Sequence, residues 1–225
     1  MKVYILADGE GLRWNNWGGV PKQLLEVNGE TLLDRMCRLC VENGLDDITI
    51  VGKFENEHAK NVRLNAKDKV DLFIKVANEA KEPFMILNGD CYYTDAIIQH
   101  CSVKEGKDWV HYMCPHENKH TGKTWAEGYI YKVFNVDKWI ALLTELQEKL
   151  NNGTIEYKTG WIINNYLNGV RDIYKPNFTK TDIFWCDETD DFDYSDMDRE
   201  LNGFNNDYLR FLHYTGYEGF KQKEW

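Results

Sequence analysis

An apolar run at the start of the chain, Val3–Leu6, opens directly into a glycine-rich segment, which is how a buried parallel strand gives way to a loop. The segments that follow alternate between helical spacing and short apolar runs: a helix over Thr31–Asn43, a strand over Asp47–Val51, a helix over Asp68–Lys81 and a strand over Phe84–Leu87. This alternation predicts an α/β fold with a mostly parallel central sheet flanked by helices. Ligands of such sheets bind beyond the carboxyl ends of the strands.

The rest of the chain is less regular. It predicts strands over Asp108–Met113, Glu127–Phe134 and Thr181–Cys186, a polar loop over His116–Lys123, and helices over Val136–Leu150 and Gly160–Leu167. The tail, Tyr194–Trp225, is aromatic and charged, and we interpret it as a lid or an oligomer contact, so a homodimer is one expected assembly.

Charge and composition exclude several classes of protein. A formal net charge of −10 argues against a dedicated nucleic-acid binder, although local cations and a metal can still attract an anionic substrate. No stretch is long and apolar enough to span a membrane, and the N-terminus lacks the apolar segment of a signal peptide. The six cysteines are scattered, which favours reduced buried thiols in a cytoplasmic protein.

The glycine-rich segment after the first strand reads Leu6-Ala7-Asp8-Gly9-Glu10-Gly11-Leu12-Arg13 and is followed by Pro21-Lys22. Glycines let backbone N–H groups approach a phosphate, and Arg13 adds a planar, permanently charged fork. A Walker loop is excluded because Gly-Lys-Ser/Thr is absent, and a dinucleotide fingerprint is excluded because position 14 is Trp. The alternative is an ordinary strand-to-helix turn, but the added Pro-Lys pair favours phosphate binding.

These residues resemble the signature of the nucleotidyltransferase superfamily, which has a Rossmann-like GT-A-type fold and includes MobA-like, sugar-phosphate and phosphocholine nucleotidyltransferases. The signature is carried by Gly9, Gly11, Arg13, Pro21 and Lys22, and the similarity continues through Gly29–Arg35. The family commonly has Ala or Gly where this chain has Asp8. The resemblance implies a single nucleotidyltransferase domain over 1–225, with a nucleotide-binding part (about 1–105), an acceptor-binding part (about 106–180) and a metal-binding segment with the tail (about 181–225).

Two carboxylates stand where the resemblance implies a metal. Asp90 follows the strand that ends in Leu87-Asn88-Gly89, and Asp187 follows the late strand. The resemblance implies that Asp90 and Asp187 together hold Mg²⁺, which prefers one or two carboxylates plus substrate phosphates and water. A turn is the alternative for the first segment and a solvated acidic loop for the second. Asp190, Asp191 and Asp193 remain rivals for the second ligand.

The resemblance also implies the substrate contacts and the reaction. The nucleotide-contacting set is Leu6, Ala7, Gly9, Gly11, Arg13, Lys22 and Asn88. Arg13 and Lys22 carry the catalytic roles, Arg13 on the departing β- and γ-phosphates and Lys22 on the α-phosphate. A phosphate oxygen of the acceptor, already anionic at neutral pH, attacks the α-phosphorus, so no general base is required.

The acceptor and the base are less constrained. His116, Lys119, His120 and Lys123 form a locally basic stretch that could meet the acceptor phosphate or be solvated. Trp125 and Glu127 could line the pocket, and the alternative for Trp125 is an aromatic residue packed in the core. The short chain resembles the small cytidylyl- and guanylyltransferases more than the long sugar enzymes, and on that resemblance we favour CTP. The expected partners are therefore an NTP and a phosphorylated small molecule, with neither nucleic acid nor a membrane. Two alternatives remain: a GT-A-type glycosyltransferase that uses a nucleotide sugar, and a non-catalytic nucleotide-binding module.

Overall fold

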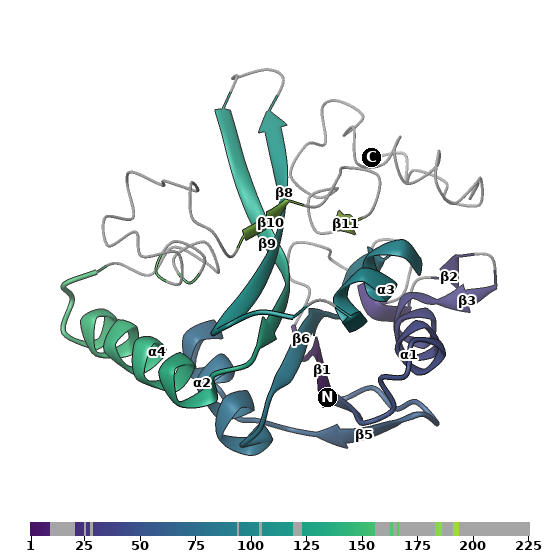
Figure 1. The fold of residues 1–225 in the computed structure, drawn as a ribbon, viewed down its shortest axis with the longest axis horizontal. Helices are drawn as coiled ribbons and strands as arrows, with labels where there is room; N and C mark the ends of the chain where they lie inside the picture. The colour runs from purple at the N-terminus through teal and green to yellow at the C-terminus, as the bar shows by residue number, and fades with distance from the viewer. Residues whose placement is uncertain are drawn as a thin grey trace. The chain divides into compact units, whose positions relative to one another are not determined.

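A computed structural model describes residues 1–9, 21–24, 26–27, 29–93, 95–103, 105–118, 123–155, 163, 166, 183–185 and 191–193 (Figure 1). Its main sheet has seven strands in the order β10-β8-β9-β6-β1-β4-β5. Strand β9 is antiparallel to both of its neighbours, whereas β10 is parallel to β8 and β5 is parallel to β4. The mostly parallel α/β fold predicted from the sequence is therefore confirmed.

The elements follow one another along the chain in the expected alternation. In the first half they are β1 (Lys2–Ala7), the short 3-10 helix η2 (Lys22–Leu24), β2 (Glu26–Val27), β3 (Glu30–Thr31), α1 (Leu32–Glu42), β4 (Ile48–Gly52), β5 (Ala59–Val62), α2 (Lys69–Ala80), β6 (Phe84–Asn88), β7 (Cys91–Tyr93) and α3 (Asp95–Val103). In the second half they are β8 (Trp109–Asn118), β9 (Lys123–Val133), α4 (Val136–Asn151), β10 (Ile183–Trp185) and β11 (Asp191–Asp193).

The first two helices predicted from periodicity begin where the sequence offers a capping oxygen. The Thr31 side chain accepts a hydrogen bond from the amide of Asp34 at 3.0 Å, and the Asp68 side chain accepts one from the amide of Asp71 at 2.9 Å. Each bond satisfies one of the amides that a helix leaves unpaired in its first turn. Helices α1 and α2 are confirmed to within about two residues of the predicted ends.

The contacts divide the chain into two compact units. The first unit comprises Met1–Tyr4, Arg63–Leu87 and Lys104–Cys186. The second unit comprises Ile5–Val62, Asn88–Val103 and Asp187–Trp225. The expectation of one nucleotidyltransferase domain over 1–225 stays a prediction.

The first unit is built around aromatic side chains. Trp139 of α4 is fully buried, with its ring centroid 6.0 Å from that of Phe73 in α2 and 5.8 Å from that of Trp109 in β8. Helices α2 and α4 lie side by side, as Figure 1 shows. Burying several large rings in one cluster removes much apolar surface from water, which stabilises this unit.

The β8–β9 hairpin is longer than predicted. We expected the first strand to end at Met113 and a polar loop to span His116–Lys123, but β8 continues to Asn118 and β9 begins at Lys123. The prediction was wrong because it relied on apolar alternation, whereas strand pairing is made by backbone groups that polar residues also provide. The register shifts between Tyr112 and Met113, as at a β-bulge.

The structure describes the remaining predicted elements only in part. The late strand is confirmed as β10, and α4 is confirmed close to its predicted limits. Of the predicted helix over Gly160–Leu167, only Ile163 and Tyr166 are described, both helical. The tail Tyr194–Trp225 lies outside the described residues. Within the parts of the chain that are described, no helix is long and apolar enough to cross a bilayer.

Candidate active site

Three strand ends meet at one edge of the sheet. Ala7 ends β1, Gly52 ends β4 and Gly89 directly follows β6. A Cβ added to Gly89 would lie 2.6 Å from the carbonyl oxygen of Leu6, and one added to Gly52 would lie 2.6 Å from that of Ala7. Both positions therefore need glycine, because a methyl group would push the strand ends apart.

The turn that carries Asp90 is bonded to the end of β1. The amide of Gly89 donates a hydrogen bond of 2.8 Å to the carbonyl of Leu6. Ala7 is fully buried, whereas Leu6, Asn88 and Asp90 are half-buried. The structure thus brings together three residues of the predicted nucleotide-contacting set and one predicted metal ligand. Their contact with a nucleotide stays a prediction.

The glycine-rich segment is described only as far as Gly9. A Cβ built on Gly9 would meet none of the described atoms within 4 Å. Gly11 and Arg13 lie outside the described residues. Lys22 begins η2, where the amide of Leu24 donates to the carbonyl of Pro21 at 2.9 Å, but the described structure does not extend to the Lys22 side chain.

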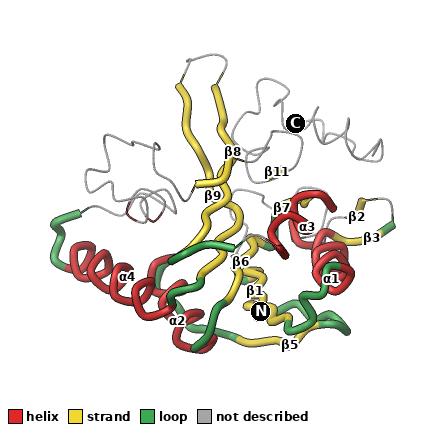
Figure 2. The backbone as a smooth tube through the Cα atoms, viewed as in Figure 1, coloured by secondary structure: helices red, strands yellow, loops and turns green. Residues whose placement is uncertain are grey.

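The late acidic segment runs beside the strand that follows Asp90. Strand β11 is antiparallel to β7, and both strands are labelled in Figure 2. The register places Asp193 opposite Cys91 and Asp191 opposite Tyr93. The sequence gives no reason for this pairing beyond the resemblance, since about a hundred residues separate the two strands. Asp187 and Asp190 lie outside the described residues, so the second metal ligand stays a prediction. The backbone of two rival ligands, Asp191 and Asp193, lies in the strand paired with β7.

The carboxylate of Asp90 has the right chemistry for a hard cation. Asp90 is a half-buried residue that closely follows the end of β6. The described residues include no group of three or more His, Cys, Asp or Glu side chains arranged for a metal. Mg²⁺ needs no such group, because it takes most of its ligands from substrate phosphates and water.

The predicted acceptor residues fall on the extended hairpin. In its register, His116 of β8 lies opposite Trp125 of β9, and Cys114 lies opposite Glu127. Lys123 is the first residue of β9. Lys119 and His120 lie outside the described residues. The register therefore groups these residues on one hairpin, and their role toward an acceptor stays a prediction.

The thiols of α1 do not form a reactive pair. Burial raises the pKa of Cys37 to about 12, with a smaller contribution from the nearby Asp34 carboxylate. Burial also raises the pKa of Cys40 to about 12. Both side chains are buried free thiols, and a thiol with so high a pKa carries almost no thiolate at neutral pH. This agrees with the interpretation of the cysteines as core residues.

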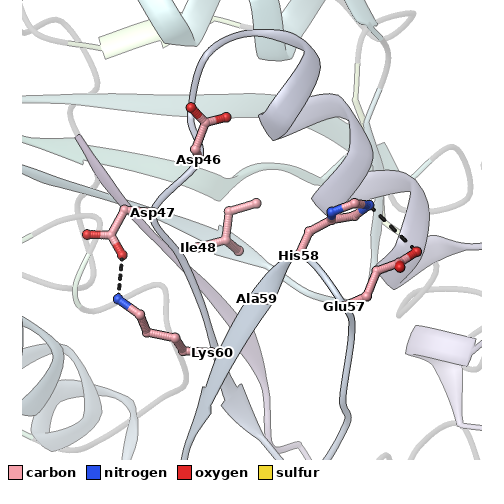
Figure 3. Close-up of a pocket in the computed structure, with 7 residues that line it drawn as sticks. All are labelled: Asp46, Asp47, Ile48, Glu57, His58, Ala59 and Lys60. Atoms are coloured by element: carbon pink, nitrogen blue, oxygen red, sulfur yellow. Dashed lines mark hydrogen bonds and ion pairs between the residues drawn. The ribbon is translucent and has the colours of Figure 1, made fainter.

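A separate pocket lies at the opposite ends of two strands. It has a volume of about 450 Å³ and is lined by residues just before and at the start of β4 and β5, among them Asp46, Glu57 and Ile48 (Figure 3). Two contacts join side chains of this pocket: Lys60 pairs with Asp47 at 3.1 Å, and His58 lies 3.8 Å from the carboxylate of Glu57. Because β4 and β5 are parallel, this pocket lies at their amino ends, away from Gly52.

Two residues at the strand ends escaped the sequence analysis. Gly52 follows an ordinary apolar strand, and nothing in its neighbours shows that Ala7 approaches it. Tyr93 reads as a β-strand aromatic, yet its hydroxyl bonds the backbone of Asn88. In both cases the partner residue comes close only in the folded chain: Ala7 approaches Gly52, and Asn88 is bonded by Tyr93. A glycine closing an apolar strand was the one available signal for Gly52.

Comparison with protein families settles the relationship that the signature suggested. The model of the MobA-like NTP transferase domain matches residues 3–116, half of the chain. The chain belongs to the MobA-like NTP transferase family. The matched residues include the glycine-rich segment, Lys22 and Asp90, and the family makes this protein a nucleotidyltransferase by class.

Solved structures agree on the fold. The chain is similar to CTP:phosphocholine cytidylyltransferase from Streptococcus pneumoniae, with a TM-score of 0.57 and 14% identity over 94% of this chain and 97% of that one. It is also similar to a glucose-1-phosphate thymidylyltransferase homologue from Bacillus anthracis, with a TM-score of 0.58 and 13% identity over 92% of this chain and 99% of that one. At such identities the likeness shows the fold alone. No curated protein sequence matches the chain significantly.

Proposed function

We propose that this NTP transferase family member couples an NTP, with CTP preferred, to the phosphate of a small phosphorylated molecule and releases pyrophosphate with the help of Mg²⁺. The observation that carries the proposal is the junction of β1 with the Asn88–Asp90 turn: the amide of Gly89 bonds the carbonyl of Leu6, at the start of the glycine-rich segment. Further support comes from the family and from one structural neighbour that acts with CTP on phosphocholine.

The chemistry requires one bond to form and one to break. An oxygen of the acceptor phosphate bonds the α-phosphorus of the NTP while the bond from that phosphorus to the bridging oxygen of the β-phosphate breaks. The departing oxygen leaves with the pyrophosphate. Since the acceptor oxygen is already anionic at neutral pH, no side chain has to remove a proton. The protein therefore has to position the reactants and neutralise charge.

Each proposed side chain has one of these tasks. Arg13 holds the β- and γ-phosphates, and Lys22 offsets the charge that grows on the α-phosphate. The amides near Gly9 and Gly11 bind the triphosphate. Asp90 and Asp187 would hold the Mg²⁺, which when bound neutralises phosphate charge and aligns the reactants.

The first experiment is pyrophosphate release with each of the four NTPs and a panel of acceptors that includes phosphocholine and glucose 1-phosphate, with and without Mg²⁺. We expect release only when an acceptor and Mg²⁺ are both present, with CTP the best nucleotide. Transfer of a sugar from a nucleotide sugar without pyrophosphate release would favour the glycosyltransferase alternative. Tight nucleotide binding without turnover for any acceptor would favour a non-catalytic binding module.

The second experiment changes the proposed α-phosphate contact. Lys22→Ala should keep the fold and lower kcat by about 10²–10³-fold, by analogy with the loss of one donor from an oxyanion hole. Lys60→Ala is the matched control, because Lys60 is an exposed lysine paired with Asp47 at the amino ends of the strands. A near-normal kcat for Lys22→Ala would refute the assignment.

A further inference from the structure

Tyr93 makes an unusual pair of contacts within the second unit. Its side chain is buried, with 1% of the residue exposed. Its hydroxyl accepts a hydrogen bond from the amide of Asn88 at 3.1 Å and donates one to the carbonyl of the same residue at 3.2 Å. One hydroxyl thus engages both backbone polar groups of a single residue, which closes the short loop between β6 and the end of β7.

That loop contains the proposed metal ligand. Asn88 is the last residue of β6, and Gly89 and Asp90 follow it directly. The turn is therefore held from two directions: the amide of Gly89 bonds Leu6 at 2.8 Å, and both backbone groups of Asn88 bond Tyr93. Holding the backbone of Asn88 and the amide of Gly89, the two residues directly before Asp90, limits where the Asp90 carboxylate can lie.

The pair of hydrogen bonds between the Tyr93 hydroxyl and Asn88, here called the clamp, is connected to α1 through the backbone of Tyr93. The Nε of Arg35 donates a hydrogen bond to the carbonyl of Tyr93 at 3.2 Å, and Nη2 of the same side chain lies 3.1 Å from the Asp95 carboxylate. These bonds join α1, the end of β7 and the first residue of α3. These bonds restrain the backbone of Tyr93, and they thereby restrain the position of the hydroxyl that bonds Asn88.

We propose that Tyr93 is a positioning residue whose hydroxyl sets the Asn88–Asp90 turn before Mg²⁺ and nucleotide bind. The inference rests on the proposed function, because it gives the turn a task in metal binding. The alternative is a purely structural role, in which Tyr93 is a core residue and its hydroxyl bonds the nearest backbone groups without affecting the metal site. The two explanations differ in what removal of the hydroxyl alone should change.

The test compares two substitutions that each delete one buried hydroxyl. Tyr93→Phe removes the clamp and keeps the ring. Tyr4→Phe is the matched control, because Tyr4 is also fully buried and its hydroxyl has no hydrogen-bond partner among the described residues. In full-length Tyr93→Phe we expect the Mg²⁺ concentration for half-maximal pyrophosphate release to rise about 10–100-fold, the usual cost of losing a group that orients a metal ligand. KM for the NTP at saturating Mg²⁺ should stay within about threefold, and Tyr4→Phe should match the wild type in both.

A second readout does not depend on turnover. Amide hydrogen exchange of Asn88 should be at least about tenfold faster in Tyr93→Phe than in Tyr4→Phe, and direct Mn²⁺ binding should weaken in Tyr93→Phe alone. If the wild-type protein releases no pyrophosphate, the proposed function fails, while exchange and Mn²⁺ binding still decide the role of Tyr93. If Tyr93→Phe does not fold, the same measurements are made on Arg35→Lys, for which we expect shifts in the same direction.

Two results would overturn the inference. One is Mg²⁺ dependence, Mn²⁺ binding and exchange in Tyr93→Phe equal to those of Tyr4→Phe. The other is a loss of rate that matches the unfolded fraction of Tyr93→Phe while the Mg²⁺ midpoint stays unchanged, because that result assigns the hydroxyl to stability alone.

Discussion

Different kinds of contact stabilise the interior of each of the two units. In the first unit, large rings converge on Trp139: the centroids of Phe73, Trp109 and Tyr131 lie 5.8–6.0 Å from its own. In the second unit, the residues that matter for the proposed site are held by backbone contacts, glycines and single hydrogen bonds at the strand ends. Aromatic burial contributes stability with some tolerance of position, whereas a close backbone contact fixes position and tolerates almost no added volume.

This difference predicts different responses to substitution. Changes in the aromatic cluster should lower the free energy of unfolding and leave the folded enzyme competent. Changes at the strand ends should lower turnover more than they lower stability. Four substitutions, ordered by the size of the change we expect, test this division.

Trp139→Ala should have the largest effect on stability. The side chain is fully buried, and its loss should cost about 3–5 kcal/mol of unfolding free energy through lost burial and a residual cavity. Urea unfolding followed by circular dichroism measures the loss, with Trp139→Phe as a milder control. The division fails if Trp139→Ala is as stable as the wild type, or if folded Trp139→Phe loses turnover.

Gly89→Ala should act mainly on turnover. Its Cβ would lie 2.6 Å from the Leu6 carbonyl and 3.3 Å from the Ala7 side chain, so the turn before Asp90 must shift. A displacement of about 1 Å can lower a rate about 10²-fold, and we expect kcat to fall by that order. The control is Gly44→Ala, which has a φ of +72° and no described atom within 4 Å of the added Cβ. It should lose about 1 kcal/mol of stability and keep kcat. Equal kcat in the two variants would contradict the prediction.

His111 should make stability depend on pH. It is fully buried, and burial, with a smaller contribution from the nearby Lys69, lowers its pKa to about 3. The unfolded chain binds the proton below about pH 6.5 and the folded chain does not, so the stabilisation present above pH 6.5 is lost as the pH falls. Between pH 7.5 and 5.5 the loss from this residue should be about 1.4 kcal/mol.

The matched variant for this residue is His111→Phe, which keeps a ring stacked on Tyr131 but cannot be protonated. Its unfolding free energy should fall less than that of the wild type across the same pH interval. Chemical denaturation at the two pH values measures the difference. Parallel curves for the two proteins would show that His111 is not the group responsible.

Arg38→Ala should have the smallest effect. Arg38 pairs with Glu30 at 2.7 Å and with Glu42 at 2.9 Å, but its side chain is 38% exposed, so solvent screens both pairs. We expect a loss of about 0.5 kcal/mol in thermal or urea unfolding, reduced further by salt, and unchanged kcat. A loss above about 2 kcal/mol would mean that the second unit depends on surface charge more than its exposure suggests.

Much of the fold could be predicted from the sequence because its signals are local. The period of apolar residues and the capping oxygens of Thr31 and Asp68 place α1 and α2. Helix α3 and the outer half of the β8–β9 hairpin were missed. The short helix α3 carries little periodic signal, and the hairpin is extended by backbone pairing that does not require apolar residues.

In the candidate site, too, local motifs could be predicted from the sequence, whereas contacts between distant residues could not. Gly9, Lys22 and Asp90 could be proposed from motifs, because their residue types follow from phosphate and metal chemistry. The contacts of Gly52 with Ala7 and of Tyr93 with Asn88 could not, because each joins residues whose proximity arises only in the folded chain. The pairing of β11 with β7 belongs to the same class.

The proposed site requires that two carboxylates far apart in the sequence bind one metal ion at the strand ends. A double-mutant cycle in Asp90→Asn and Asp187→Asn, with kcat for pyrophosphate release as the readout, measures whether they do. If both residues hold the same Mg²⁺, each single variant should lose most of the rate, and the double variant should be scarcely slower than either one. Losses that multiply in the double variant would show that the two carboxylates act independently, and the account of a shared metal site would then be wrong.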